Sequence, residues 1–185
     1  MILPGRIDRK GASLDQFLQT DAKAFNQDAL APRPEFCYEV RMTRMEIDIE
    51  ALIPHRGRMR LIDGVMDVDD ERAVTTATAS ADWPLYRDGS VDVLVTIELV
   101  AQSAALFEGW KRKQSGKGGA KGWLVGIKGA EFQRPRIAVP AVLITEVRRN
   151  YALESYAVFG GTVRAGAELV AAVSIQAFRP EEEDA

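Results

Sequence analysis

The sequence predicts a single α+β domain in which an antiparallel sheet wraps around one long buried helix. Residues 93–113 are apolar on nearly every face of a helix, a pattern typical of a helix that is covered on all sides. Residues 122–178 instead form apolar-rich stretches separated by turn residues, which indicates a run of antiparallel strands. A sheet that curls around the helix reconciles the two patterns, because each strand then directs alternate side chains inward.

Capping residues, turn residues and changes in hydrophobic periodicity bound the individual elements. Ser90 and Asp92 are candidate caps for the start of the long helix. Three consecutive basic residues beginning at Lys111 suit the negative end of the helix dipole, just before a glycine-rich segment that favours a break. The expected elements are a helical turn at 46–53, strands at 59–67 and 72–80, the helix at 93–113, and strands at 122–132, 141–150, 154–166 and 168–178.

Composition narrows the classes of function. A chain of 185 residues with 46% apolar content can bury one core, and its net charge of −3 lacks the positive field of a general nucleic-acid binder. Its one cysteine, Cys37, excludes an internal disulfide and, with a single histidine, leaves no ligand set for a zinc site. No stretch has the character of a signal peptide or a membrane span. We therefore expect a cytoplasmic protein without metal or nucleic acid.

Composition also divides the chain into three parts. Residues 1–44 are polar and are interpreted as a loosely attached extension. Met42 and Met45 lie just before the first regular segment, so either could also be the true start. Residues 45–180 carry the patterned domain, and residues 181–185 (EEEDA) are interpreted as a solvated acidic tail.

Glu98 and Gln102 interrupt the apolar pattern of the helix. They are four residues apart and therefore share one face. If that face were exposed, the pair would be an ordinary surface feature. Their apolar neighbours favour a pocket instead, where a carboxyl group can hold a proton and donate it to a leaving hydroxyl while Gln102 orients it.

His55 is the only histidine and lies between Pro54 and Arg56 at a segment boundary. It is therefore the only imidazole available to move protons near neutral pH. A histidine in such a position is more often a packed or hydrogen-bonded structural residue than a catalytic one. The residues alone leave both readings open.

Three separated motifs carry a resemblance to a known family. They are IPHRGRMRLID at 53–63, TIELVAQSAAL at 96–106 and LVGIKGAEFQRPRIAVPAVLITEV at 124–147. In order and spacing they resemble the β-hydroxyacyl-acyl carrier protein dehydratases of the hotdog fold. The resemblance covers residues 45–178 and implies a single hotdog domain without cofactors, dimerisation through sheet edges, and acyl chains held in a tunnel.

Carried onto this chain, the resemblance assigns the catalytic carboxylate of the helix to Glu98 and its supporting glutamine to Gln102. The family's usual catalytic histidine falls at Pro84, and the glycine whose amide polarises the thioester carbonyl falls at Val93. These departures are similar to those of the second dehydratase of aryl-polyene gene clusters, which keeps a Pro-His near its start. The resemblance then leaves His55 as the imidazole of the site.

The activity that the resemblance implies is elimination of water from a 3-hydroxyacyl thioester in fatty-acid or polyene biosynthesis. His55 would remove the C2 proton, Glu98 would protonate the departing C3 hydroxyl, and amides at the helix start would stabilise the enolate. Two alternatives stay open. The chain could be a non-catalytic hotdog subunit that pairs with a histidine-bearing dehydratase, or it could be a hotdog acyl-thioesterase.

The implied partners are an acyl carrier protein and a second hotdog chain, in a homodimer or a heterodimer. Basic residues at the helix end are usually no more than a solvated surface. The more specific interpretation is that they dock the acidic carrier protein. Charge complementarity would accelerate this association. The candidate docking residues are Lys111, Arg112, Arg134 and Arg136.

Overall fold

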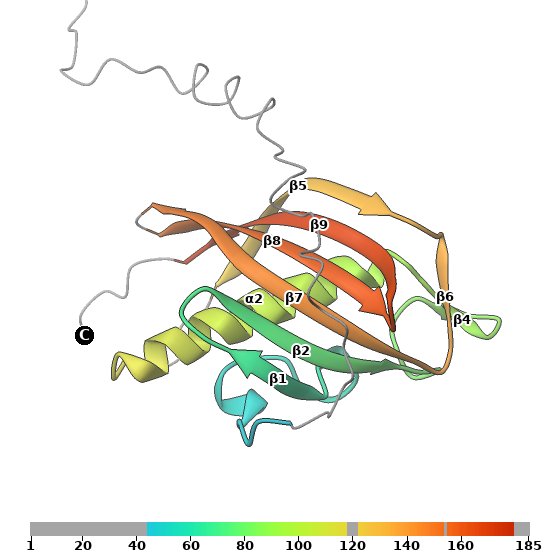
Figure 1. Ribbon diagram of the computed structural model, residues 1–185, viewed down its shortest axis with the longest axis horizontal. Coiled ribbons are helices and arrows are strands. Elements are labelled where there is room, and N and C mark those ends of the chain that lie inside the picture. Colours follow the sequence, from blue (N-terminus) through green and yellow to red (C-terminus); the bar gives the residue numbers. More distant parts are fainter. Residues whose placement is uncertain (1–43, 118–121, 154, 180–185) are drawn as a thin grey trace, which may run out of the picture. The chain divides into compact units, whose positions relative to one another are not determined.

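The computed structural model describes residues 44–117, 122–153 and 155–179. Within them, six antiparallel strands form one curved sheet, with the single long helix lying along one of its faces (Figure 1). The spatial order of the strands is β1 (Gly64–Val68), β2 (Arg72–Ala79), β7 (Ala141–Leu153), β8 (Tyr156–Ala165), β9 (Glu168–Phe178) and β5 (Trp123–Phe132). The strand that follows the helix, β5, therefore forms one edge of the sheet.

The helix, α2, spans Val95–Gln114 and packs against β7, β2, β8 and β9. It begins two residues later than the sequence predicted. The N-cap residue is Leu94, and no side chain caps the helix there. The carboxylate of Asp92 accepts a hydrogen bond from the N–H of Leu94, before the helix begins, so the prediction of Asp92 as a cap is wrong. Ser90 was expected as an alternative cap but instead lies in a short strand, because its backbone pairs with Ala138.

The helix and the sheet approach closely at a position where β8 carries no side chain. A Cβ placed on Gly161 would lie 2.8 Å from Cγ1 of Val100, so only glycine fits at this crossing. About two turns further along the helix, Phe107 packs edge-to-face on Phe159 of β8, with ring centroids 6.4 Å apart. The core is thus a helix seated in the concave face of the sheet, as the apolar pattern predicted.

A second, three-stranded sheet was not expected from the sequence. It contains β3 (Tyr86–Arg87), β4 (Ser90–Asp92) and β6 (Arg136–Ala138). These strands have two or three residues each, too few for a hydrophobic period to show. Their pairing places the turn after β5 next to the start of α2, where the N–H of Val93 donates to the carbonyl of Pro135.

The prediction of a strand at 59–67 is wrong for the first half of this segment. Only Gly64–Val68 forms β1, whereas Gly57–Met59 forms a 3-10 turn. The physical reason is that the carbonyl of Met59 and the N–H of Leu61 bind the side chain of Gln102 rather than a neighbouring strand. The helical turn expected at 46–53 is a 3-10 turn at Ile49–Ala51.

Three expectations concern segments outside the described residues. They are the polar extension, the acidic tail and most of the glycine-rich loop after α2.

Candidate active site

The loop that carries His55 is held by the side chain next to it. Buried Leu52 and Ile53 anchor the loop in the core. The guanidinium of Arg56 donates hydrogen bonds to the carbonyls of Ile53 at 2.7 Å, His55 at 2.8 Å and Glu50 at 2.7 Å. Three backbone carbonyls converging on one guanidinium leave this loop little freedom, so the direction of the imidazole is set locally.

Gln102 connects the helix to the same loop. Its side chain is fully buried, and its Oε1 accepts a hydrogen bond from the N–H of Leu61 at 3.0 Å. Its Nε2 donates to the carbonyl of Met59 at 2.6 Å and to Oε1 of Glu98 at 2.8 Å. Both amide hydrogens and one lone pair of the amide oxygen are used, so Gln102 is a hydrogen-bonded buried link between the helix and the loop.

His55 and Glu98 meet within one chain. Nε2 of His55 lies 3.2 Å from Oε1 of Glu98, the same oxygen that accepts the bond from Gln102. The two side chains are 29% and 32% exposed, so the pair is reachable from solvent without being fully hydrated. An imidazole nitrogen and a carboxyl oxygen 3.2 Å apart are close enough to act as an acid–base pair on one substrate.

The other imidazole nitrogen has a different environment. Nδ1 of His55 is buried and has no hydrogen-bond partner among the described residues. A buried N–H without an acceptor costs about 1–3 kcal/mol, whereas a bare nitrogen costs less because it leaves no donor unsatisfied. A hydrogen on the imidazole is therefore better placed on Nε2, beside Glu98, than on the buried Nδ1.

A cavity of about 260 Å³ runs along the helix from this pair. One stripe of α2 lines it, at successive spacings of three and four residues, and every member of the stripe is half-buried. The alanines in the middle leave the space that larger side chains would fill. The members of the stripe are Glu98, Ala101, Ala105, Glu108 and Arg112.

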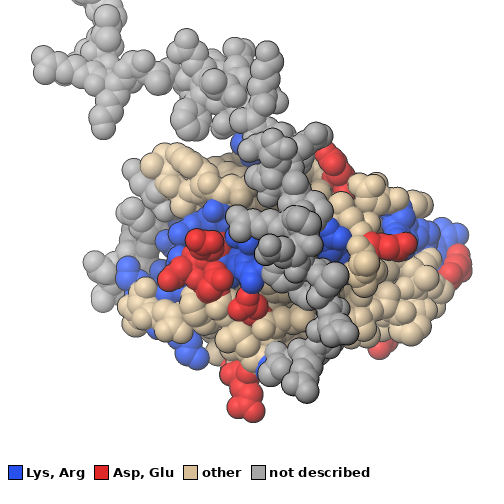
Figure 2. Space-filling model, in the orientation of Figure 1, with Lys and Arg blue, Asp and Glu red and all other residues tan. Residues whose placement is uncertain are grey.

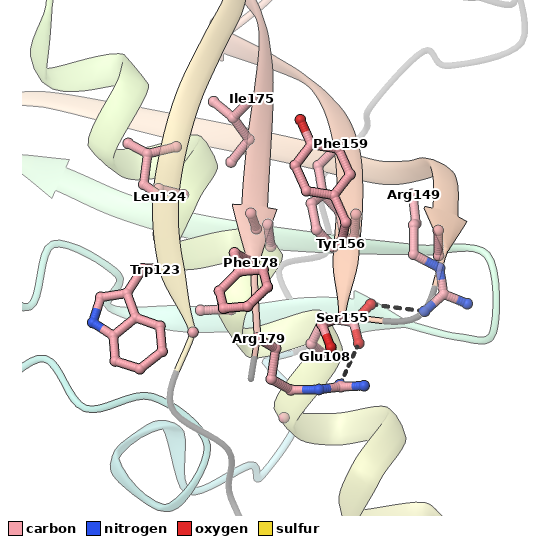
Figure 3. Close-up of a pocket in the computed structure, with 18 of the residues that line it drawn as sticks. Glu108, Trp123, Leu124, Arg149, Ser155, Tyr156, Phe159, Ile175, Phe178 and Arg179 are labelled. Carbon is pink, nitrogen blue, oxygen red and sulfur yellow. Dashed lines mark hydrogen bonds and ion pairs between the residues drawn. The ribbon is translucent and has the colours of Figure 1, made fainter. Parts of the chain in front are cut away.

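The strand ends form the opposite wall of the cavity. Figure 3 shows aromatic and aliphatic side chains from β5, β8 and β9 lining it, among them Trp123, Phe159 and Phe178. At the end remote from His55, Arg149 and Arg179 both reach Glu108, with N–O distances of 2.8 and 3.5 Å (Figure 3). The cavity thus has an acid–base pair at one end, a small-residue corridor and a charged far end.

The positions where the usual family residues are replaced contribute nothing to this cavity. Neither Pro84 nor Val93 is among the described residues that line it. The N–H groups of Val93 and Leu94 already donate to the carbonyl of Pro135 and the carboxylate of Asp92. The expectation that amides at the helix start stabilise an enolate is therefore wrong for these two amides, because both are used by the protein itself.

The four candidate docking residues do not form one surface. Arg136 lies in β6 and donates to Ser90, close to the start of α2, while Lys111 lies in its last turn and pairs with Asp70. These ends are separated by the length of a 20-residue helix, roughly 30 Å. Figure 2 shows acidic and basic side chains interspersed over the visible face. Docking of a carrier protein by these residues stays a prediction. The residues would form two separate groups, one near each end of α2.

Four contributors to the site were missed in the sequence. Arg56 holds the His55 loop, and Glu108, Arg149 and Arg179 lie at the far end of the cavity. Glu108 could have been found, since it continues the helical spacing that starts at Glu98. The arginines offered no such signal, because their place in the site depends on how β7 and β9 cross the helix.

The helix seated in a single curved antiparallel sheet defines this protein as a single hotdog, and solved structures agree. The dehydratase heterocomplex ApeI:P from Xenorhabdus doucetiae matches with a TM-score of 0.69 and 22% identity, over 75% of this chain and 94% of that chain. An uncharacterized protein from Pyrococcus horikoshii matches with a TM-score of 0.53 and 15% identity, over 70% and 96%. A sigma28-regulated virulence protein from Campylobacter jejuni reaches 0.53 and 15%, over 72% and 86%.

The family follows from the sequence itself. The pattern of the ApeP-like family, described as ApeP dehydratase, matches residues 47–185. This chain therefore belongs to the ApeP-like dehydratase family, and its function is 3-hydroxyacyl dehydratase-like. No curated protein matches the sequence. In the described part of the chain, no helix has both the length and the apolar character needed to cross a membrane.

Proposed function

We propose that this protein eliminates water from 3-hydroxyacyl groups carried as thioesters on an acyl carrier protein, with His55 and Glu98 as the reacting pair. The observation that carries the proposal is the 3.2 Å contact between Nε2 of His55 and Oε1 of Glu98 at one end of an apolar cavity. Elimination needs a base and an acid on the same substrate, and the geometry brings together one of each. Family membership supports the same reaction.

In the proposed reaction, the substrate enters between the two groups. Nε2 of His55 takes the C2 proton, the electrons of that C–H bond form the C2–C3 double bond, and the C3–O bond breaks. Protonated Glu98 gives its proton to the departing hydroxyl, which leaves as water. The imidazolium and carboxylate that remain are close enough to pass the proton back and restore the starting pair. Gln102 acts as a positioning residue through its bond to Glu98.

This reactive form requires the hydrogen of the imidazole on Nδ1. Because Nδ1 of His55 is buried without an acceptor among the described residues, that form is disfavoured by about 1–3 kcal/mol. Each 1.4 kcal/mol corresponds to about a tenfold change in rate. We therefore expect slow dehydration by the chain alone, unless a second protein supplies an acceptor for Nδ1.

The same observation favours a second candidate function, a hotdog subunit that becomes fully active only with a partner. The edge strand β5 supports this candidate, because Trp123, Val125 and Ile127 are 52%, 54% and 50% exposed on it. A sheet edge with large exposed apolar side chains is a template for pairing with another strand. The partner would be a second hotdog chain, as in the heterocomplex from Xenorhabdus doucetiae.

Mass spectrometry of a 3-hydroxyacyl-acyl carrier protein incubated with the purified chain tests the proposal. We expect loss of one water in the wild type and a fall of two or more orders of magnitude in both His55→Gln and Glu98→Gln. Glu71→Gln removes an exposed carboxylate that is absent from the cavity lining and serves as the matched control. Free thiol in place of an enoyl product would instead show the thioesterase alternative.

Activity that appears only after a hotdog partner is added, and survives His55→Gln, would establish the companion subunit instead. Full activity of the chain alone in the Glu98→Gln variant would contradict both assignments. The proposal includes the cytoplasmic location expected from the sequence, because the protein must share a compartment with the carrier-bound acyl intermediates.

A further inference from the structure

The far end of the cavity is chemically unlike the rest of it. Glu108, Arg149 and Arg179, which we term the basic mouth, all line the cavity that holds His55 and Glu98. Between Glu98 and Glu108 the helix presents only Ala101, Ala104 and Ala105 to the cavity, so nothing charged on the helix interrupts the corridor. A ligand that fills the corridor has its two ends in different environments, one with an acid–base pair and one with guanidinium groups.

The basic mouth carries excess positive charge. Arg149 and Arg179 share the single carboxylate of Glu108, so the three groups together carry a net charge of +1. Each guanidinium contacts Glu108 through its Nη1, and the two arginine side chains are 33% and 39% exposed. Two arginines that share one carboxylate keep further N–H groups that suit the oxygens of a phosphate.

The separation of the two ends matches a specific chemical linker. Glu98 and Glu108 are ten residues apart on one helix, which corresponds to about 15 Å. The pantetheine arm that joins a thioester sulfur to its phosphate is about as long as four extended residues, or roughly 15 Å. With the thioester at His55 and Glu98, the phosphate of an extended arm reaches the basic mouth.

We propose that Arg149 and Arg179 bind the phosphate of a phosphopantetheine arm whose thioester lies at His55 and Glu98. This inference rests on the proposed function and names the part of the substrate that the far end of the cavity recognises. Glu108 holds the two guanidiniums in place, and the net charge of +1 complements the single negative charge of the phosphodiester. The partly exposed mouth also suits a group that is tethered to a carrier in solvent.

An anionic group at the end of the acyl chain would present similar chemistry in the opposite orientation. The phosphate fits better, because an acyl terminus would lie at the more solvent-exposed arginines while the carrier would have to approach over the His55 loop. The experiment therefore compares both sources of negative charge on otherwise identical ligands.

The test measures binding of three ligands to the full chain by isothermal titration calorimetry. They are a 3-hydroxyacyl phosphopantetheine, the same 3-hydroxyacyl pantetheine without phosphate, and a pantetheine thioester whose acyl chain ends in a carboxylate. We expect the phosphate to tighten binding roughly tenfold or more, and the advantage to shrink as salt is added. Arg149→Gln and Arg179→Gln should each remove most of this advantage while binding of the phosphate-free ligand changes little.

Arg148→Gln is the matched control, because it removes an arginine of the same strand that pairs with Glu146 and Glu71 and is absent from the cavity lining. We expect this variant to retain the preference for phosphate. Equal affinity of the wild type for the first two ligands, or a preference that survives both arginine substitutions, would overturn the inference. An advantage that appears only with the carboxylate-terminated chain would overturn it too and would assign the mouth to the acyl end.

Mass spectrometry of the bound thioesters separates this inference from the proposed function. Selective phosphate binding without any dehydration would leave the mouth in place and refute the dehydratase. Dehydration at equal efficiency with and without the phosphate would support the enzyme and refute the role of the mouth.

Discussion

Nε2 of His55 lies 3.2 Å from Oε1 of Glu98 although the two residues are 43 positions apart in the sequence. The loop of His55 and the helix of Glu98 are joined by Gln102, which binds the carbonyl of Met59, the N–H of Leu61 and the carboxylate of Glu98. The pair is therefore supported from both sides by hydrogen bonds that do not involve the reacting atoms of His55. The effect of Gln102 on stability can therefore be tested separately from the effect of Glu98 on activity.

Gln102→Ala is expected to lower the free energy of unfolding by roughly 2–4 kcal/mol. The substitution leaves the backbone groups of Met59 and Leu61 without their partner and opens a cavity in a fully buried position. Urea denaturation followed by circular dichroism measures the change. Glu98→Gln, by comparison, should change stability by less than about 1 kcal/mol while abolishing dehydration, and equal destabilisation by both would refute the separation of roles.

Arg56→Lys is expected to lower dehydration roughly tenfold with a much smaller effect on substrate affinity, because a single ammonium cannot hold three carbonyls in the geometry that guanidinium provides. The chain has one histidine, so the Cε1–H signal of His55 in a proton–carbon NMR spectrum is unambiguous. That signal should shift or broaden in the variant. Arg58→Lys, whose guanidinium reaches the carbonyl of Asp82 instead, is the control and should leave the signal unchanged.

Substitution of two adjacent glycines of β8 by alanine should change the stability of the protein by different amounts. A Cβ on Gly161 would meet both methyl groups of Val100, and overpacking of this kind costs about 1–3 kcal/mol. A Cβ on Gly160 would meet only the side-chain amide of Asn150, which can move aside. We therefore expect thermal unfolding to show a clearly lower Tm for Gly161→Ala and a nearly unchanged Tm for Gly160→Ala. Similar losses in both would place the helix farther from the sheet than we describe.

The contribution of the turn between β1 and β2 to the free energy of unfolding should depend on the ionisation of Asp69. Hydrogen bonding from the backbone N–H of Glu71 lowers the pKa of Asp69 from its ordinary value of 3.8. A lowered pKa in the folded state means that the stabilisation is present above about pH 3.8 and is lost as the pH falls through the folded pKa.

Because Asp69 is half exposed, Asp69→Ala should cost only about 0.5–1 kcal/mol at pH 7. Denaturation of wild type and variant at pH 7 and at pH 2–3 measures the difference at each pH. The difference should diminish at the lower pH, and a difference that grew there would contradict the sign of the pKa shift. Asp69→Asn keeps an acceptor oxygen without the charge, so its effect should vary less with pH.

Val125→Lys is expected to prevent pairing through the edge of β5. The side chain is 54% exposed and is absent from the cavity lining, so a lysine there can be solvated without disturbing the site of one chain. Analytical ultracentrifugation should show a smaller assembly than the wild type forms. Val142→Lys, at a comparably exposed position in β7, is the control and should leave the assembly intact. An assembly unaffected by Val125→Lys would exclude this edge as the interface.

Local patterns predicted much of the fold. The apolar run of α2 and the strands β2, β5, β7, β8 and β9 are visible in the sequence because each depends on the period of neighbouring residues. The pairing of β5 with β9, rather than with the next strand β7, was not visible there. The strand expected at 59–67 failed for the opposite reason, since the backbone around Met59 and Leu61 is bound by a helix residue about forty positions away. The short strands β3, β4 and β6 contain too few residues for a period to show.

The sequence by itself determined that Glu98 and Gln102 share a helix face, because four residues are about one helical turn. It also left His55 as the one imidazole in the chain. Only the tertiary structure decided that His55 meets Glu98 and that Arg149 and Arg179 converge on Glu108. Contacts between residues this far apart follow from how loops and strand ends pack on the helix, and no local period encodes that packing.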